Sequence, residues 1–146
     1  MYAKVAVGFV LGLTGAYIVS KMTKKKQTSN KRLVFIGTYT QPAGHIRGDE
    51  LGKGIYSFEL NEDGSLSPLH CTTTLSNPSF LTTSTDGRFL YAVSETSHGM
   101  ISAYKINRET GALTLIDAKP SGGADPCHID YKDSMVVCAN YSGGSF

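Results

Sequence analysis

The chain has 146 residues, with 14 Lys or Arg against 12 Asp or Glu, and its formal net charge is +2. Residues 1–32 carry seven of the cations and no acid, whereas residues 33–146 carry the other seven and all 12 acids, so this larger part has a formal charge of −5. An acidic body argues against a nucleic-acid-binding domain, and without a Gly-X-Y period, heptads or many cysteines the collagen, coiled-coil and disulfide-scaffold classes are excluded.

An uncharged and mostly apolar segment, VAVGFVLGLTGAYIVS, occupies residues 5–20, between Lys4 and a group of lysines that begins at Lys21. A helix of this length rises roughly 24 Å, short of a ~30 Å hydrocarbon core, but lysine side chains at both ends extend its reach. We therefore predict one N-terminal hydrophobic helix within residues 1–22, acting as a signal anchor in a membrane, with a cleaved secretory signal as the alternative.

Residues 23–32 (TKKKQTSNKR) are predicted to form a basic polar tether. Because the positive charge lies mainly after the apolar segment, the positive-inside rule keeps the following residues in the cytosol. The composition is similar to that of signal anchors in the mitochondrial outer membrane, which is one candidate location, and a secreted protein is the alternative. The three cysteines, Cys71, Cys127 and Cys138, lack the spacing of a metal site and predict reduced thiols in a reducing compartment.

From residue 33 onward, short runs of aromatic and β-branched residues alternate with turn signals such as the Asp-Gly pair at 86–87, a pattern typical of antiparallel strands. No helix of ten or more residues is predicted after residue 22. Residues 54–69 align with 100–116 at an offset of 46, and Asn77 aligns with Asp125 at an offset of 48. Four short strands per period of this length are typical of a β-propeller blade, since one such sheet cannot bury both faces alone.

The predicted fold class is therefore all-β, a β-propeller of four-stranded antiparallel blades, of which residues 33–146 hold about two and a half. Strands are predicted at 33–38, 54–60 and 66–70 in an incomplete first blade, at 79–84, 88–94, 100–107 and 112–117 in a complete second, and at 127–131 and 134–140 in a third. Closed propellers need about four to eight blades, so we expect these to be the N-terminal blades of a longer chain. A short protein that closes its ring by oligomerising is the alternative, and the oligomeric state stays open.

Several segments resemble the lactonase family of seven-bladed β-propellers, which includes the 6-phosphogluconolactonase type and the carboxy-muconate cyclising enzymes. The segments are FIGTYT (35–40), GKGIYSFELNEDGSLSPL (52–69), NPSFLTTSTDGRFLYAVSE (77–95), ISAYKINRETGAL (101–113), DPCHI (125–129) and CANYSGGSF (138–146). The resemblance implies hydrolysis of a sugar lactone, such as 6-phosphogluconolactone, by an activated water in the central funnel without metal or organic cofactor. A catalytically inactive propeller fragment that serves as a binding or interaction module is the alternative.

His128 is the candidate catalytic residue, because it follows the start of an innermost strand and imidazole can act as a general base near neutral pH. A structural histidine is the competing interpretation.

Arg47, in the long loop 41–53, is a candidate phosphate ligand, with an exposed loop arginine as the alternative. Tyr39, Asn140 and Tyr141 end the second strands of their blades and are predicted to bind substrate, although the glycine-rich residues that follow Tyr141 also suit a tight turn. Glu95 ends a strand in the same way, as a funnel acid or a rim carboxylate.

Overall fold

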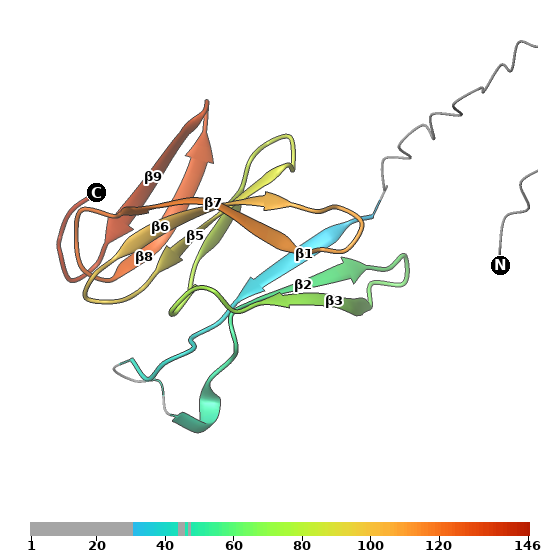
Figure 1. The fold of residues 1–146 in the computed structure, drawn as a ribbon, viewed down its shortest axis with the longest axis horizontal. Coiled ribbons are helices and arrows are strands. Elements are labelled where there is room, and N and C mark those ends of the chain that lie inside the picture. The colour runs from blue at the N-terminus through green and yellow to red at the C-terminus, as the bar shows by residue number, and fades with distance from the viewer. Residues whose placement is uncertain (1–30, 44–45, 47) are drawn as a thin grey trace, which may run out of the picture.

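The structure is a computed structural model that describes residues 31–43, 46 and 48–146. Nine strands in this part of the chain form three antiparallel sheets (Figure 1). The first sheet contains β1 (Leu33–Gly37), β2 (Ile55–Leu60) and β3 (Leu66–Thr72); the second contains β4 (Leu81–Thr83), β5 (Phe89–Ser94), β6 (Met100–Ile106) and β7 (Leu113–Pro120); the third contains β8 (Pro126–Lys132) and β9 (Met135–Asn140). Each strand overlaps a range that the repeat predicts.

The fold class predicted from the sequence needs one correction, which concerns its N-terminal hydrophobic helix. The described residues form an all-β, propeller-like fold whose only helical element is the 3-10 turn η1 (Gly48–Glu50), because short strands joined by turns leave no longer helical stretch. The predicted helix at 1–22 and nearly all of the tether at 23–32 fall on residues 1–30, outside the described residues. No helix in the described ranges is long and apolar enough to cross a bilayer. The membrane and location predictions therefore gain no support.

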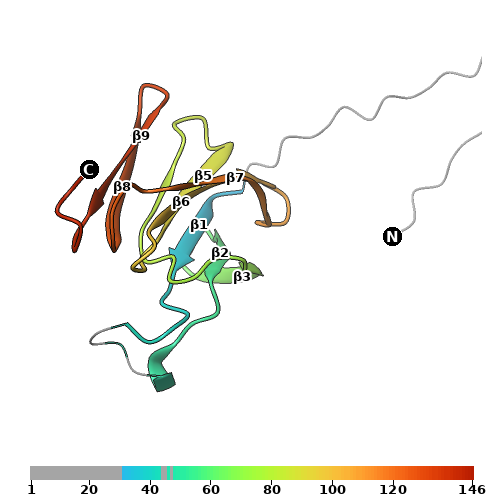
Figure 2. The ribbon, with the colours of Figure 1, turned by 60° about the vertical axis from the view of Figure 1, so that its left-hand side comes forward.

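The second sheet lies between the first and the third and is covered on both faces (Figure 2). Side chains alternate along its strand β5, as the pleat requires: Leu90 and Ala92 pack in a core shared with the first sheet, and Tyr91 and Val93 pack toward the third. The first core also contains Ile55, Tyr104 and Ile106, and the second contains Ile129 and Cys138. The sheets thus stack face to face, as neighbouring blades of a propeller do.

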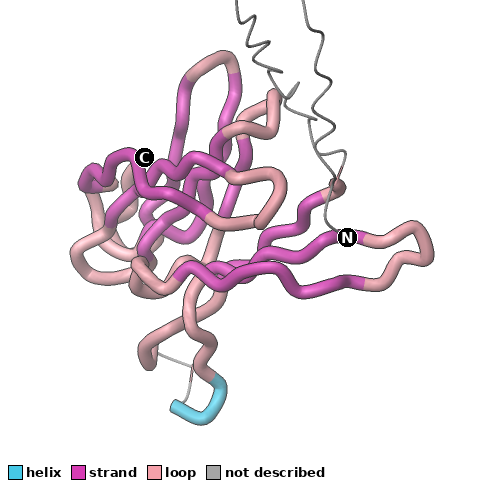
Figure 3. Tube along the Cα trace, turned by 45° about the vertical axis from the view of Figure 1, so that its right-hand side comes forward, coloured by secondary structure: helices cyan, strands magenta, loops and turns pink. Residues whose placement is uncertain are grey.

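Local turn chemistry accounts for the hairpins within each sheet. Between β4 and β5, the Asp86 carboxylate accepts hydrogen bonds from the Ser84 hydroxyl (2.7 Å) and the Arg88 amide (3.0 Å), while Gly87 takes φ 64°. These bonds lower the pKa of Asp86 to about 2. The connection from β1 to β2, which contains η1, is longer and extends away from the sheets (Figure 3).

Candidate functional site

The ends of three equivalent strands open onto one groove. Tyr39 follows β1, Glu95 follows β5 and Tyr141 follows β9, so each residue continues the second strand of its predicted blade. Together with Asn77 and Asp125 they line a depression of about 440 Å³, which we call the blade-end groove. Its volume lies within the range of roughly 300–1,000 Å³ that is usual for small-molecule sites.

Two equivalent turns bring these ends into place. Asn77 and Asp125 both adopt a left-handed backbone, with φ 46° and φ 53°, a conformation that Asn and Asp tolerate better than most residues. The carbonyl of Asn77 accepts a hydrogen bond from the amide of Glu95 (3.0 Å), and that of Asp125 accepts one from the amide of Tyr141 (2.9 Å). The same backbone bond therefore recurs in the second and third sheets and fixes where each strand end lies.

The side chain of Asn77 connects the first sheet to the second. It is only 3% exposed. Its Oδ1 accepts hydrogen bonds from the amides of Thr40 (2.9 Å) and Gln41 (2.8 Å), and its Nδ2 donates to the carbonyl of Glu95 (3.2 Å). Since buried amide groups are costly when unpaired, this side chain, hydrogen-bonded through both its oxygen and its nitrogen, holds the two strand ends against each other. Asn77 was not among the predicted site residues, although its equivalence to Asp125 at the repeat spacing was a usable signal.

A carboxylate with two hydroxyl donors lies in the groove. The hydroxyl of Tyr39 donates to Oε1 of Glu95 at 3.0 Å, and the hydroxyl of Ser79 donates to Oε2. Burial, the hydrogen bond to Glu95 and the charge of that carboxylate all raise the pKa of Tyr39, so its phenol is neutral at physiological pH. Each carboxylate oxygen can accept more than one hydrogen bond, which leaves Glu95 with acceptor capacity for a ligand.

Of the residues predicted to bind substrate, Tyr39 and Tyr141 both line the groove, and Tyr141 is 81% exposed. Asn140 is only 3% exposed. Its Nδ2 donates to Oγ of Ser145 (3.1 Å), across the turn after β9, and to the Ser121 carbonyl (3.2 Å) in the connection between β7 and β8. Arg47 lies outside the described residues. The binding roles of these residues stay predictions.

The candidate catalytic histidine lies on β8. The His128 ring packs on the ring of Phe80, with 4.4 Å between centroids and an angle of 41° between planes. Phe80 and His128 occupy the same position in the repeat, so the contact joins equivalent points of the second and third sheets. His128 is solvent-exposed and is not among the described residues that line the groove. Its catalytic role also stays a prediction.

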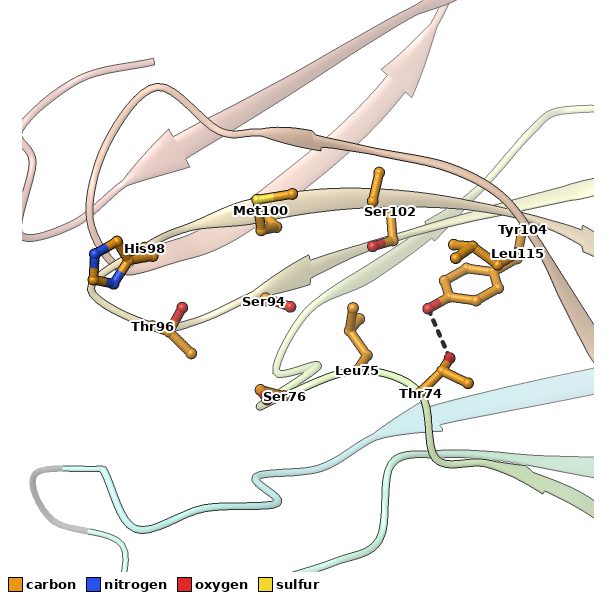
Figure 4. Close-up of a pocket in the computed structure, with 11 residues that line it drawn as sticks. Thr74, Leu75, Ser76, Ser94, Thr96, His98, Met100, Ser102, Tyr104 and Leu115 are labelled. Atoms are coloured by element: carbon orange, nitrogen blue, oxygen red, sulfur yellow. Dashed lines mark hydrogen bonds between the residues drawn. The ribbon is translucent and has the colours of Figure 1, made fainter.

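A second cavity of about 340 Å³ is lined by the segment 74–76 and by strands of the second sheet (Figure 4). The hydroxyls of Thr74 and Tyr104 are 3.3 Å apart on one side of it, and His98 lies toward the other end. The other described residues that line this cavity carry hydroxyl or apolar side chains, and none of them carries a carboxylate. Within the described ranges, no group of three His, Cys, Asp or Glu side chains is placed to hold a metal ion. The blade-end groove is therefore the better candidate for polar chemistry.

The chain is similar in sequence and in fold to proteins of one known family. The profile of a family described as "Lactonase, 7-bladed beta-propeller" matches residues 33–146. The 6-phosphogluconolactonase of Bacillus subtilis (strain 168) is 32% identical over 118 residues, which cover 78% of this chain and 32% of that protein. A provisionally named 6-phosphogluconolactonase from Bacteroides uniformis ATCC 8492, solved by crystallography, has a TM-score of 0.67 and 41% identity, covering 79% of this chain and 32% of that one.

The periplasmic gluconolactonase of Pseudomonas aeruginosa has a similar structure, with a TM-score of 0.63 and 27% identity over 76% of this chain and 31% of that one. The chain therefore spans about a third of the length of the proteins it matches. The family match at 33–146 covers the described strands and the residues of the blade-end groove.

Proposed function

The chain belongs to the lactonase family of seven-bladed β-propellers, and on that premise we propose that the protein hydrolyses a sugar lactone. The observation that carries the proposal is that the family match covers residues 33–146 and so includes every residue of the blade-end groove. Two of the similar proteins bear names that specify a gluconolactone, phosphorylated in one and unmodified in the other. The proposed substrate class is accordingly a lactone of a sugar acid, with or without a phosphate.

The proposed reaction is a direct hydrolysis. A water molecule gives a proton to a general base as its oxygen adds to the lactone carbonyl carbon. The tetrahedral intermediate then collapses, the bond between that carbon and the ring oxygen breaks, and the ring oxygen takes up a proton to become a hydroxyl. The product is the open-chain hydroxy acid. Such a reaction needs one base near neutral pH and donors for the negative charge that develops on the carbonyl oxygen.

His128 is the base that we propose for this water. Its ring is solvent-exposed on β8, and contact with Phe80 limits its orientation while leaving it accessible. Tyr39 and Tyr141 are proposed to contact the substrate from the groove, and Arg47 is proposed to bind the phosphate of a phosphorylated lactone. The roles of His128, Tyr39 and Tyr141 rest on residue chemistry and on position in the repeat, and that of Arg47 rests on residue chemistry alone.

The test is an assay of the protein expressed from its complete reading frame. We expect it to hydrolyse D-glucono-δ-lactone, 6-phosphoglucono-δ-lactone or both faster than the uncatalysed reaction. His128→Ala is expected to lower kcat by about 100-fold or more, as loss of a general base does, and His98→Ala, which removes another exposed histidine without a proposed role, is the matched control. A folded protein without turnover on either lactone would refute the proposal and favour the binding-module alternative. Unchanged turnover in His128→Ala would remove only the role of that residue.

A further inference from the structure

We propose that Glu95 is the acceptor for the hydroxyl groups of a sugar in the blade-end groove, so that this groove selects hydroxylated lactones over plain ones. The inference rests on the proposed lactone hydrolysis and adds a specificity-determining residue to it. It is carried by three observations: the fixed position of Glu95, the nature of its partners, and the side chains that surround it.

The backbone of Glu95 is hydrogen-bonded through both its amide and its carbonyl. Its amide donates to the carbonyl of Asn77 (3.0 Å), and its carbonyl accepts from the side-chain amide of the same residue (3.2 Å). Because Asn77 also binds two amides after β1, the backbone of Glu95 is locked to both sheets. A carboxylate on such a fixed backbone binds a ligand with little loss of conformational freedom.

The donors to Glu95 are hydroxyl groups rather than cations. Tyr39 and Ser79 each donate to one carboxylate oxygen, which fixes its plane without neutralising its charge. A carboxylate oriented by hydroxyl donors remains a strong hydrogen-bond acceptor, because each of its oxygens has a further lone pair. Glu95 therefore suits the binding of neutral hydroxyls.

The charged residues around Glu95 also favour a neutral ligand. Asp125 is the second carboxylate of the groove, and no Lys or Arg is among the described residues that line it. The described ion pairs lie elsewhere in the fold, at Glu59, Asp86 and Asp117. An anionic group would be repelled here, so a phosphate on the substrate would lie outside this part of the site and the polyhydroxyl part within it.

Aromatic side chains complete the match to a sugar ring. Tyr39 and Tyr141 lie at the equivalent positions of the neighbouring sheets, so the groove that contains Glu95 is also lined by a tyrosine from each of those sheets. Aromatic rings provide apolar area for the C–H faces of a sugar, while a charged acceptor takes its hydroxyl hydrogens. The equivalent of Ser79 in the third sheet is Cys127, so the hydroxyl that orients Glu95 is particular to this blade.

The test compares two lactones in the protein expressed from its complete reading frame. D-Glucono-δ-lactone carries ring hydroxyls, and δ-valerolactone has the same ring without them. We expect Glu95→Gln to lower kcat/KM for the hydroxylated lactone by about 10- to 100-fold, mainly through KM, since it removes charge-assisted hydrogen bonds. Turnover of δ-valerolactone is expected to stay within about twofold. Glu109→Gln makes the same chemical change in an exposed turn and is the matched control.

Each outcome separates the inference from the proposed function. If the wild type hydrolyses neither D-glucono-δ-lactone nor 6-phosphoglucono-δ-lactone, the proposed function fails. If it is active and Glu95→Gln loses equally on D-glucono-δ-lactone and δ-valerolactone, or on neither, the function stands and the hydroxyl-acceptor role is refuted. If thermal unfolding shows that Glu95→Gln does not fold, Ser79→Ala decides, because it removes a hydroxyl that orients the Glu95 carboxylate and that has no proposed contact with the substrate. A selective loss on the hydroxylated lactone supports the inference, and equal or no loss overturns it.

Discussion

Replacement of Asn77 by alanine should be one of the most destabilising single changes in the described part of the chain. The substitution leaves the amides of Thr40 and Gln41 without their acceptor and removes the donor to the carbonyl of Glu95. An orphaned buried amide costs about 1–3 kcal/mol and a lost neutral hydrogen bond about 1 kcal/mol. Alanine also fits the left-handed backbone at φ 46° poorly, at about 1 kcal/mol. With partial rescue by water, we expect a loss of about 3–5 kcal/mol in the free energy of unfolding.

Two further variants separate these contributions. Asn77→Gly keeps the backbone conformation accessible and loses only the side chain, so it should be about 1 kcal/mol less destabilising than Asn77→Ala, even after the entropy of glycine is counted. Asp125→Asn is the matched control at the equivalent position. The measurement is urea-induced unfolding of the complete protein, with the slope checked for two-state behaviour. A loss below about 1 kcal/mol in Asn77→Ala would refute the argument that these bonds join the two sheets.

Three other predictions follow from single features. Hydrogen bonds hold the pKa of Asp86 at about 2, below its ordinary value of 3.8, so its contribution to stability is present above pH 4 and is lost as the pH falls toward 2; Asp86→Asn should flatten this part of a stability–pH profile, and an unchanged profile would contradict the assignment. Tyr39 and Tyr91 both have a raised pKa, so near-ultraviolet titration should show a late phase of tyrosine ionisation, and Tyr39→Phe should reduce the amplitude of that phase. A Cβ on Gly37 would overlap the carbonyl oxygen of Pro78, so Gly37→Ala should destabilise by about 1–3 kcal/mol, whereas Gly48→Ala has open space; equal melting temperatures of the two variants would disprove this packing.

The strand pattern was predictable from sequence because its causes are local. Alternating side chains and turn residues such as Asp86 act within a few positions, and the offset of 46 to 48 residues repeats those signals. The sequence also predicted that Tyr39, Glu95 and Tyr141 end equivalent strands, since this follows from strand order alone. In the structure all three residues line one groove.

The contacts between sheets were not predictable in the same way. Tyr39 and Glu95 are 56 positions apart, and nothing in their local sequence shows that a hydroxyl will meet a carboxylate. Asn77 resembles an ordinary residue before proline until its side-chain bonds to two amides are known. The helix predicted from the apolar residues 5–20 lies outside the described residues, whose only helical element is the 3-10 turn η1.

The paired turns at Asn77 and Asp125 have a consequence for how the family's binding sites can change. The hydrogen bonds that place Glu95 and Tyr141 are donated by their backbone amides to backbone carbonyls. These bonds therefore do not depend on which side chain follows the strand at position 95 or 141. In such a repeat the backbone turn and its hydrogen bond can stay the same in every blade. The side chain at the strand end can then differ from blade to blade, and with it the chemistry of the groove. A library varied at Tyr141 should accordingly keep its melting temperature while its ligand preference diverges, and widespread unfolding across the library would show that shape and chemistry are not separable there.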